Sequence, residues 1–146
     1  MIRETASNNK VESEQISIER FSAKEIKKLP TFLGETDVIQ TVLNQPGVSS
    51  VGEGSIGFNV RGGDADQNLI LQDEAIIFNP SHALGFFGTF NAELIRGVDL
   101  YKGIMPAQFG GRISSVLDVK MRDGNFDEFK INAGIGLVSG LSLIHI

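Results

Sequence analysis

GFNVRGGDADQNLILQDEAIIFNPSH, residues 57–82, contains three short apolar runs, FNV, LIL and AIIF. Each run is bounded by Gly, Asp, Asn or Pro, which favour turns. Short apolar runs between turn-forming residues are typical of short, well-buried β-strands. Asp73 and Glu74 alone separate the strand predicted at residues 69–72 from the one predicted at residues 75–78. These two strands are therefore predicted to form a tight hairpin.

Two short helices are predicted before this stretch. Ser22 and Glu25 have the spacing of a capping box, which opens a helix that continues to Lys28. Thr36 or Asp37 can cap a second helix, which ends near Asn44 and has one apolar face. The fold class is therefore α+β, a small mixed β-sheet with two or three short helices. Further strands are predicted at residues 16–19, 48–51, 98–102 and 113–121.

Composition limits the classes of function. The 146 residues are enough for one domain with tails. The net charge of −5 gives no reason to expect nucleic acid as a partner. The chain has no cysteine, so neither a disulfide framework nor a thiolate metal site is expected. No apolar run approaches the roughly 20 residues of a membrane helix, and residues 1–15 are polar and lack the apolar core of a signal peptide.

Three motifs resemble known binding or catalytic sites, but each lacks a feature that such a site requires. Gly52–Gly57 fits G-x-G-x-x-G, but a strand is predicted after it where a dinucleotide site needs a helix. Residues 64–68 have the acidic spacing of a calcium loop, but Leu69 stands where that loop requires glycine. His82 has neither a second histidine nor a cysteine to share a metal, and no nucleophile elbow accompanies it. We therefore predict no catalytic residue, no metal and no cofactor, and rank an enzyme last.

Several motifs together resemble one known family. They are VRGG at residues 60–63, DQNLILQDEAIIFNPSH at 66–82, GFFGTFNAELIRGVDLYKG at 85–103 and MPAQFGGRISSVLDVKMRDGN at 105–125. In this order they resemble the plug domain of TonB-dependent outer-membrane receptors over about residues 21–125. The resemblance is greatest to the type common in Bacteroidetes, in which a carboxypeptidase-regulatory-like domain precedes the plug.

The resemblance implies three parts of the chain. Residues 1–20 are expected to be a polar linker, residues 21–125 the plug, and residues 126–146 the start of a transmembrane β-barrel. Apolar and polar residues alternate from Phe129 to Leu137, as in a barrel strand. The same alternation suits an amphipathic strand in a soluble sheet, and its position directly after the plug favours the barrel. The chain is therefore expected to be a truncated fragment, with the rest of the barrel missing.

The resemblance also implies a function. In this family the plug occludes the lumen of the barrel in the cell outer membrane and takes part in energised uptake of a substrate. The expected partners are the chain's own β-barrel domain and TonB in the periplasm, and no TonB box is identified in residues 1–15. Transported ligands of such receptors are iron chelates, cobalamin, glycans or peptides. The alternative is a free-standing soluble α+β interaction domain with no transport role.

Two arginines are candidate contact residues. Arg61 and Arg112 each lie beside a glycine pair at a predicted strand end. A planar guanidinium at such a position can bind a carboxylate through two hydrogen bonds. By resemblance to plug domains, both are expected to contact acidic residues on the barrel wall. Arg96 has a different context and is interpreted as an ordinary surface cation.

A second group of candidates lies in a long apolar loop predicted at residues 79–90. His82, Phe86 and Phe87 are expected to face the substrate. For the aromatic residues, including Phe90, two other interpretations stay open: packing in the domain core and packing against the barrel.

Overall fold

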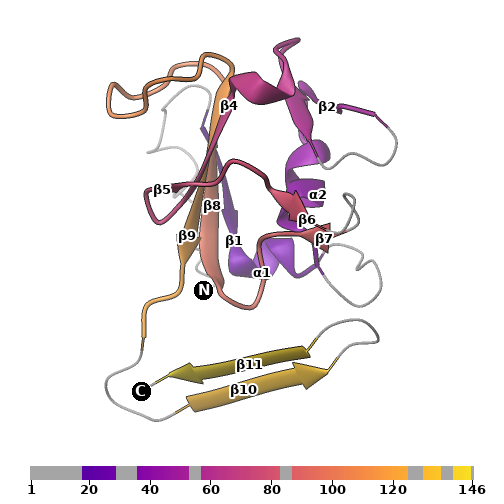
Figure 1. Cartoon of the computed structure of the whole chain (residues 1–146), viewed down its shortest axis with the longest axis vertical. Coiled ribbons are helices and arrows are strands. Elements are labelled where there is room, and N and C mark those ends of the chain that lie inside the picture. Colours follow the sequence, from indigo (N-terminus) through magenta and orange to yellow (C-terminus); the bar gives the residue numbers. More distant parts are fainter. Residues whose placement is uncertain are drawn as a thin grey trace, which may run out of the picture.

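The computed structural model describes residues 18–28, 36–52, 57–82, 87–124, 130–135 and 140–145. Within these ranges, five strands form one mixed sheet (Figure 1). In order across the sheet they are β1 (Ile18–Ser22), β8 (Ile95–Tyr101), β9 (Ser115–Met121), β4 (Asn68–Gln72) and β5 (Ala75–Ile76). β4 and β9 run parallel, and the other neighbouring pairs run antiparallel.

Two short helices among the described residues pack on one face of this sheet. α1 (Ala23–Ile26) begins at the predicted capping box, in which Ser22 and Glu25 accept hydrogen bonds from each other's backbone amides. α2 (Val38–Leu43) begins at Asp37, whose carboxylate accepts from an amide of the first turn at 2.8 Å. No helix in the described part is long and apolar enough to cross a membrane. The predicted fold class, a small mixed sheet with short helices, is confirmed.

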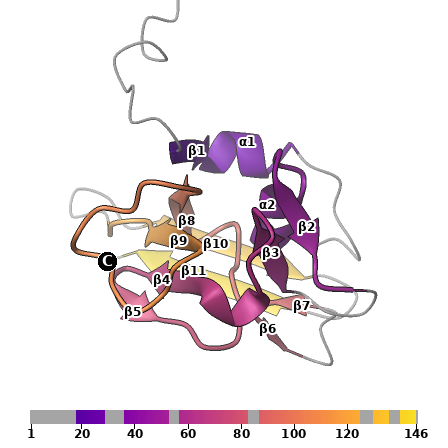
Figure 2. The ribbon, with the colours of Figure 1, turned by 90° about the horizontal axis from the view of Figure 1, so that it is seen from above.

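The main core lies between the sheet and the helices. Ile26 of α1 and Ile39 of α2 meet Leu100 and Leu117 of the two central strands, and none of the four has exposed surface. Full burial of such a side chain contributes about 1.5–3 kcal/mol. The other buried members of this core are Val38, Val42, Phe58, Val60, Ile70, Phe90, Ala92, Ile95, Val98 and Val119. Viewed from above, α2 lies beside the sheet (Figure 2).

The opposite face of the sheet is partly apolar and partly charged. A smaller cluster of Leu69, Leu71, Tyr101 and Val116 is covered by Met105 and Phe109, from the connection between β8 and β9.

The charged part of this face links three adjacent strands. Asp99 of β8 accepts a hydrogen bond from Lys120 of β9 at 2.6 Å and lies 3.6 Å from Arg20 of β1. Asp118 is the register partner of Asp99 and lies 3.8 Å from Lys120. Burial raises the pKa of the Asp118 carboxyl above its ordinary value, and the charge of Lys120 opposes this shift.

Three two-stranded antiparallel ribbons and one short 3-10 helix, η2 (Ala65–Gln67), complete the described structure. The ribbons are β2 (Val48–Ser50) with β3 (Phe58–Val60), β6 (Ser81–His82) with β7 (Phe87–Gly88), and β10 (Lys130–Ile135) with β11 (Gly140–His145). The strand predicted at residues 129–137 is present as β10, whereas no strand is predicted where β11 lies. In Figure 1 the β10–β11 ribbon lies apart from the five-stranded sheet.

Two predictions from the central stretch need correction. The loop predicted at residues 79–90 is interrupted, because β6 and β7 pair within it. The run AIIF is not a buried strand: Ile76 is 54% exposed and Phe78 is 86% exposed. The hairpin itself is confirmed, with φ of +45° and +71° at Asp73 and Glu74, positive as in a type I′ turn. The error arises because β5 is a two-residue strand at the edge of the sheet, with a strand on one side only in the described part.

Ile39→Val should lower the free energy of unfolding by about 1 kcal/mol, because it removes a methylene from a fully buried side chain. Urea unfolding of the 146-residue chain measures the change. The matched control is Ile113→Val, at a side chain that is 76% exposed, and it should change stability by less than about 0.5 kcal/mol. Equal losses at the two positions would contradict the assignment of the core.

Asp118→Asn should stabilise the chain near neutral pH. The folded-state pKa of Asp118 lies above its unfolded value of 3.8, so the folded state binds this proton more tightly. The stability that protonation contributes is present below the unfolded pKa and is lost as the pH rises through the folded pKa. Asn never ionises and avoids this loss.

The gain over the wild type should therefore be present at neutral pH, shrink as the pH falls through the folded-state pKa towards 3.8, and be absent below 3.8. Urea unfolding across this range measures it, with Asp123→Asn as the control at a side chain that is 81% exposed. A gain that does not vary with pH would show that ionisation of Asp118 is not its cause.

Candidate functional site

The site is built from two glycine-containing turns, the first of which carries Arg61. The amide of Gly63 donates to the carbonyl of Val60 at 2.9 Å and closes a tight turn at the end of β3. Its central residues, Arg61 and Gly62, have φ of +50° and +80°. A left-handed conformation costs a non-glycine residue roughly 1–2 kcal/mol. The Arg61 amide donates to the carbonyl of Gly47 at 2.9 Å, so this unfavourable conformation is held by a hydrogen bond.

The second turn carries Arg112. It follows Phe109, whose ring centroid lies 5.2 Å from that of Tyr101. This contact anchors the connection between β8 and β9 on the face of the sheet opposite the helices. Gly111 has φ of +85°, which glycine adopts at no steric cost. Three residues after Arg112, the chain enters β9 at Ser115.

Asn68, Ser114 and Ser115 join the two turns, and we call them the serine–asparagine junction. Asn68 Nδ2 donates to the carbonyl of Phe58 at 2.6 Å, and its Oδ1 accepts from Ser115 Oγ at 2.6 Å. Ser114 Oγ donates to the carbonyl of Val60, the first residue of the Arg61 turn, at 2.8 Å. Both arginine turns therefore lie at the end of the sheet where β4 and β9 begin, the upper end in Figure 1.

The two arginines differ from the other arginines of the domain. Both side chains are exposed, and neither guanidinium forms an ion pair or hydrogen bond with any residue in the described ranges. By contrast, Arg96 Nη1 lies 2.5 Å from the Asp123 carboxylate, and Arg20 is paired with Asp99. The structure thus brings the two predicted contact residues to one end of the sheet and leaves both available to an outside carboxylate.

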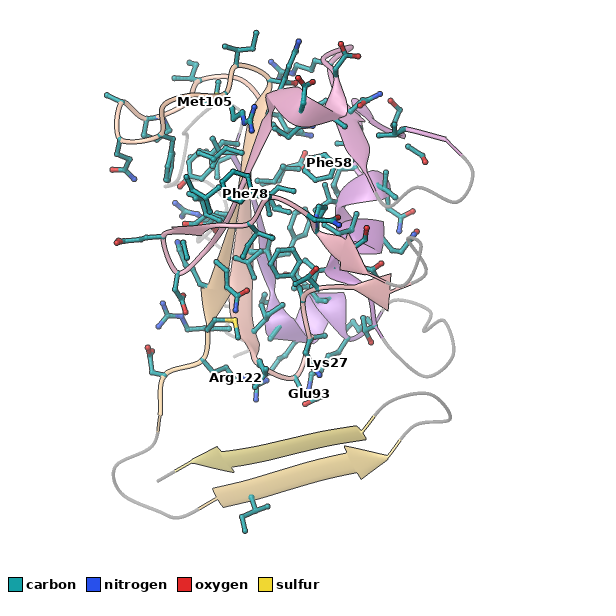
Figure 3. The ribbon with its side chains drawn as sticks, in the orientation of Figure 1. Lys27, Phe58, Phe78, Glu93, Met105 and Arg122 are labelled. Atoms are coloured by element: carbon teal, nitrogen blue, oxygen red, sulfur yellow. The ribbon has the colours of Figure 1, made fainter. Side chains whose placement is uncertain are left out.

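A surface pocket of about 290 Å³ lies beside the Arg112 turn. Its lining combines charged groups from Asp66 and Arg112 with the apolar side chains of Ile76, Ile77 and Phe78. Phe78 is labelled in Figure 3 and is almost fully exposed. An apolar wall with a cation and a carboxylate at its edge can accept a ligand that has both apolar and charged parts.

Part of the loop predicted to face the substrate lies next to this pocket. Ser81 lines the pocket and opens the β6–β7 ribbon, in which His82 and Phe87 are register partners. Phe86 lies outside the described residues. Phe90 is 5% exposed and packs in the main core, so of the interpretations left open for it the structure agrees with core packing. No group of three or more His, Cys, Asp or Glu side chains in the described part could hold a metal ion.

Sequence reasoning missed the serine–asparagine junction. The sequence pattern alone assigns Asn68 to an acidic turn and Ser114 and Ser115 to a strand. A signal was present, because an Asn at the start of an apolar strand must bury its amide, and a buried amide requires hydrogen-bond partners. Which residue serves as a hydrogen-bond partner depends on the parallel pairing of β4 with β9, which brings Ser115 beside Asn68.

The mixed sheet and its short helices form a small α+β domain, and a family match identifies it. Residues 10–116 match the TonB-dependent Receptor Plug Domain family. Because this match covers more than half of the 146 residues, the chain belongs to that family. This family is a receptor domain and not a family of enzymes, which confirms the prediction that the chain is not an enzyme.

Solved receptor structures share the fold. The siderophore receptor PirA of Acinetobacter baumannii has a TM-score of 0.59 and 20% identity, covering 75% of this chain and 18% of that one. The ferric enterobactin receptor PfeA of Pseudomonas aeruginosa, in a mutant form, has a TM-score of 0.60 and 18% identity, covering 82% and 19%. The outer membrane transporter YddB of Escherichia coli has a TM-score of 0.57 and 21% identity, covering 75% and 17%. The chain thus spans less than a fifth of each receptor. No curated protein sequence matches it.

Gly63→Ala should destabilise the domain by about 1–3 kcal/mol, because a Cβ there would lie 2.4 Å from Ser114 Oγ and 2.8 Å from Ser114 Cβ. The new methyl group must displace Ser114 and break its hydrogen bond to Val60. Urea unfolding of the chain measures the loss.

The matched control is Gly110→Ala, since a Cβ at Gly110 meets no atom within 4 Å. It should change stability by less than about 0.5 kcal/mol. Gly63→Ala should cost less in a Ser114→Gly background than in the wild type, because Ser114→Gly removes the two nearest clashing atoms and leaves Gln67 Oε1 at 2.9 Å. An equal cost in both backgrounds would mean that the contact with Ser114 is not what excludes a side chain at Gly63.

Proposed function

We propose that this chain is the plug of a TonB-dependent receptor in the cell outer membrane. In this proposal it occludes the lumen of the receptor's own β-barrel and takes part in energised uptake of a substrate. The observation that carries the proposal is the family match over residues 10–116. The similar structures support it, because they are siderophore receptors and an outer membrane transporter of which this chain spans the plug-sized part.

Arg61 and Arg112 are the proposed contacts with acidic residues on the barrel wall. They are exposed, they lie at one end of the sheet, and within the described ranges they have no anionic partner. A hydrogen bond to a charged group contributes about 1.5–3 kcal/mol. Two such contacts, held by turns that share one junction, would fix this end of the plug as a unit.

The proposed substrate-facing surface comprises His82, Phe86 and Phe87, with the neighbouring pocket at Phe78 and Arg112. An iron chelate is the first ligand class to test, since PfeA has been crystallised in complex with enterobactin. Cobalamin, glycans and peptides are the other classes. Retention of a radiolabelled ligand by cells that carry the receptor distinguishes them.

We also propose that TonB, in the periplasm, binds a segment N-terminal to β1. A carboxypeptidase-regulatory-like domain ahead of the plug, as in the Bacteroidetes type, belongs to the same proposal. The DNA sequence on both sides of this reading frame tests both features and shows whether alternating strands of about ten residues continue the barrel. The competing function is that of a soluble interaction domain. The antiparallel β10–β11 pair is compatible with both functions, because neighbouring strands of a transmembrane barrel are also antiparallel.

The central test uses the complete receptor in the outer membrane. Deletion of residues 21–124 should open the lumen and make cells sensitive to a large antibiotic that the intact membrane excludes. The double variant Arg61→Ala/Arg112→Ala should raise sensitivity in part, by loosening the plug, with each lost contact worth about 1.5–3 kcal/mol.

Arg96→Ala is the matched control, since Arg96 already pairs with Asp123 inside the domain. It should leave sensitivity unchanged. A deletion with no effect on permeability would exclude the gate. A double variant that behaves as Arg96→Ala does would exclude the two arginines as barrel contacts while leaving the gate intact.

A further inference from the structure

The edge strand β1 is connected to the Arg61 turn through one buried lysine. Lys102 follows β8, and its side chain is 9% exposed. Its ammonium donates to the carboxylate of Glu19 in β1 and, at 3.0 Å, to the carbonyl of Pro46. One cation therefore binds the sheet edge and the turn after α2 at the same time.

The turn after α2 in turn holds Arg61. The amide of Val48 donates to the carbonyl of Gln45 at 3.2 Å, and Gly47 has φ of +78°, so Pro46 and Gly47 occupy the centre of a type II turn. The carbonyl of Gly47 accepts the Arg61 amide at 2.9 Å. Contiguous contacts thus run from Glu19 through Lys102 and the Pro46–Gly47 turn to Arg61.

The charges make this connection depend on β1. The second carboxylate oxygen of Glu19 is buried and has no hydrogen-bond partner in the described part of the chain, so the carboxylate is held at this position chiefly by Lys102. Without Glu19, the buried ammonium would keep a neutral carbonyl as its described partner. A buried cation that loses its counter-charge is strongly disfavoured and is relieved by turning out to water. That movement would break the bond to Pro46.

We propose that the Glu19–Lys102 pair is a latch that couples the pairing of β1 to the position of Arg61. When β1 leaves β8, Lys102 loses Glu19, releases Pro46 and frees the turn that holds the Arg61 amide. β1 is suited to leave, because it is an edge strand with β8 as its one neighbour in the described sheet. The consequence for a receptor rests on the proposed function: a pull on the chain before β1 would weaken the barrel contact of Arg61.

The test is hydrogen exchange of individual amides, followed by NMR on the 146-residue chain. Glu19→Gln keeps the size of the side chain and removes its charge. It should speed exchange of the Arg61 amide and of the β1 amides by about tenfold or more relative to the β9 amides, because both become part of one local opening.

The matched control is Glu93→Gln. Glu93 also ties the N-terminal segment to the domain, through Lys27 Nζ at 2.5 Å, at the opposite end of the sheet (Figure 3). Within the described part of the chain its carboxylate pairs with Lys27 and contacts neither Pro46 nor Lys102, so its loss should leave exchange of the Arg61 amide unchanged. Lys102→Met should match Glu19→Gln at Arg61, since either change removes the pair.

Three outcomes would overturn the latch. They are faster exchange in β1 with no change at Arg61, equal acceleration throughout β9, and an equal effect of Glu93→Gln at Arg61. If Glu19→Gln does not fold, wild-type exchange in low urea decides instead: β1 and Arg61 must share one opening free energy below that of β9. No transport is measured, so failure of the latch leaves the proposed function untouched, and a failed transport assay leaves the latch untouched.

Discussion

The side-chain amide of Asn68 is the interaction on which the upper end of the domain depends. Its nitrogen reaches the carbonyl of Phe58 and its oxygen accepts from Ser115, so one buried side chain joins β3, β4 and β9. These polar groups form hydrogen bonds with each other in place of water. If one partner is lost, the remaining buried polar groups have no hydrogen-bond partner, which is unfavourable. Asn68 is 7% exposed and Ser115 is fully buried. The two arginine turns lie beside this junction, so buried polar contacts fix their relative placement together with the apolar packing of Val60 and Phe109.

The parts of the fold that the sequence predicted are those set by local chemistry. The capping box at Ser22, the Asp37 cap and the turn at Asp73–Glu74 each depend on residues a few positions apart. The failures are those in which a distant segment decides burial. Phe78 is as apolar as Phe58, but one lies beyond an edge strand and the other in the core. For the site, the neighbouring glycines and the family resemblance predict Arg61 and Arg112 as contact residues, and that role stays a prediction. Their convergence required the parallel pairing of β4 with β9, which no local pattern encodes.

Low sequence identity with a shared fold has a physical basis in this domain. The solved receptors are 16–21% identical to the chain, yet the sheet and helices superpose with TM-scores near 0.6. Cores accept many apolar side chains of similar volume. Turns with positive φ and a close approach such as Gly63 to Ser114 accept few alternatives. The constraint on such a sequence therefore falls on its glycines and its buried polar groups more than on its apolar residues.

The order of strands in the sheet also determines when the domain can form during synthesis. β8 and β9 are the centre of the sheet, yet they follow β1 and β4 along the chain, and β4 pairs with β9 across 47 positions, from Asn68 to Ser115. β1 has no sheet partner until β8 has been made, and β4 can pair only with β5 until β9 follows. Pairings between distant segments form slowly, because a long loop must close before any contact is gained. The five-stranded sheet therefore cannot be completed until β8 and β9 have been made, whereas the local pairs of β2 with β3 and of β4 with β5 can form earlier.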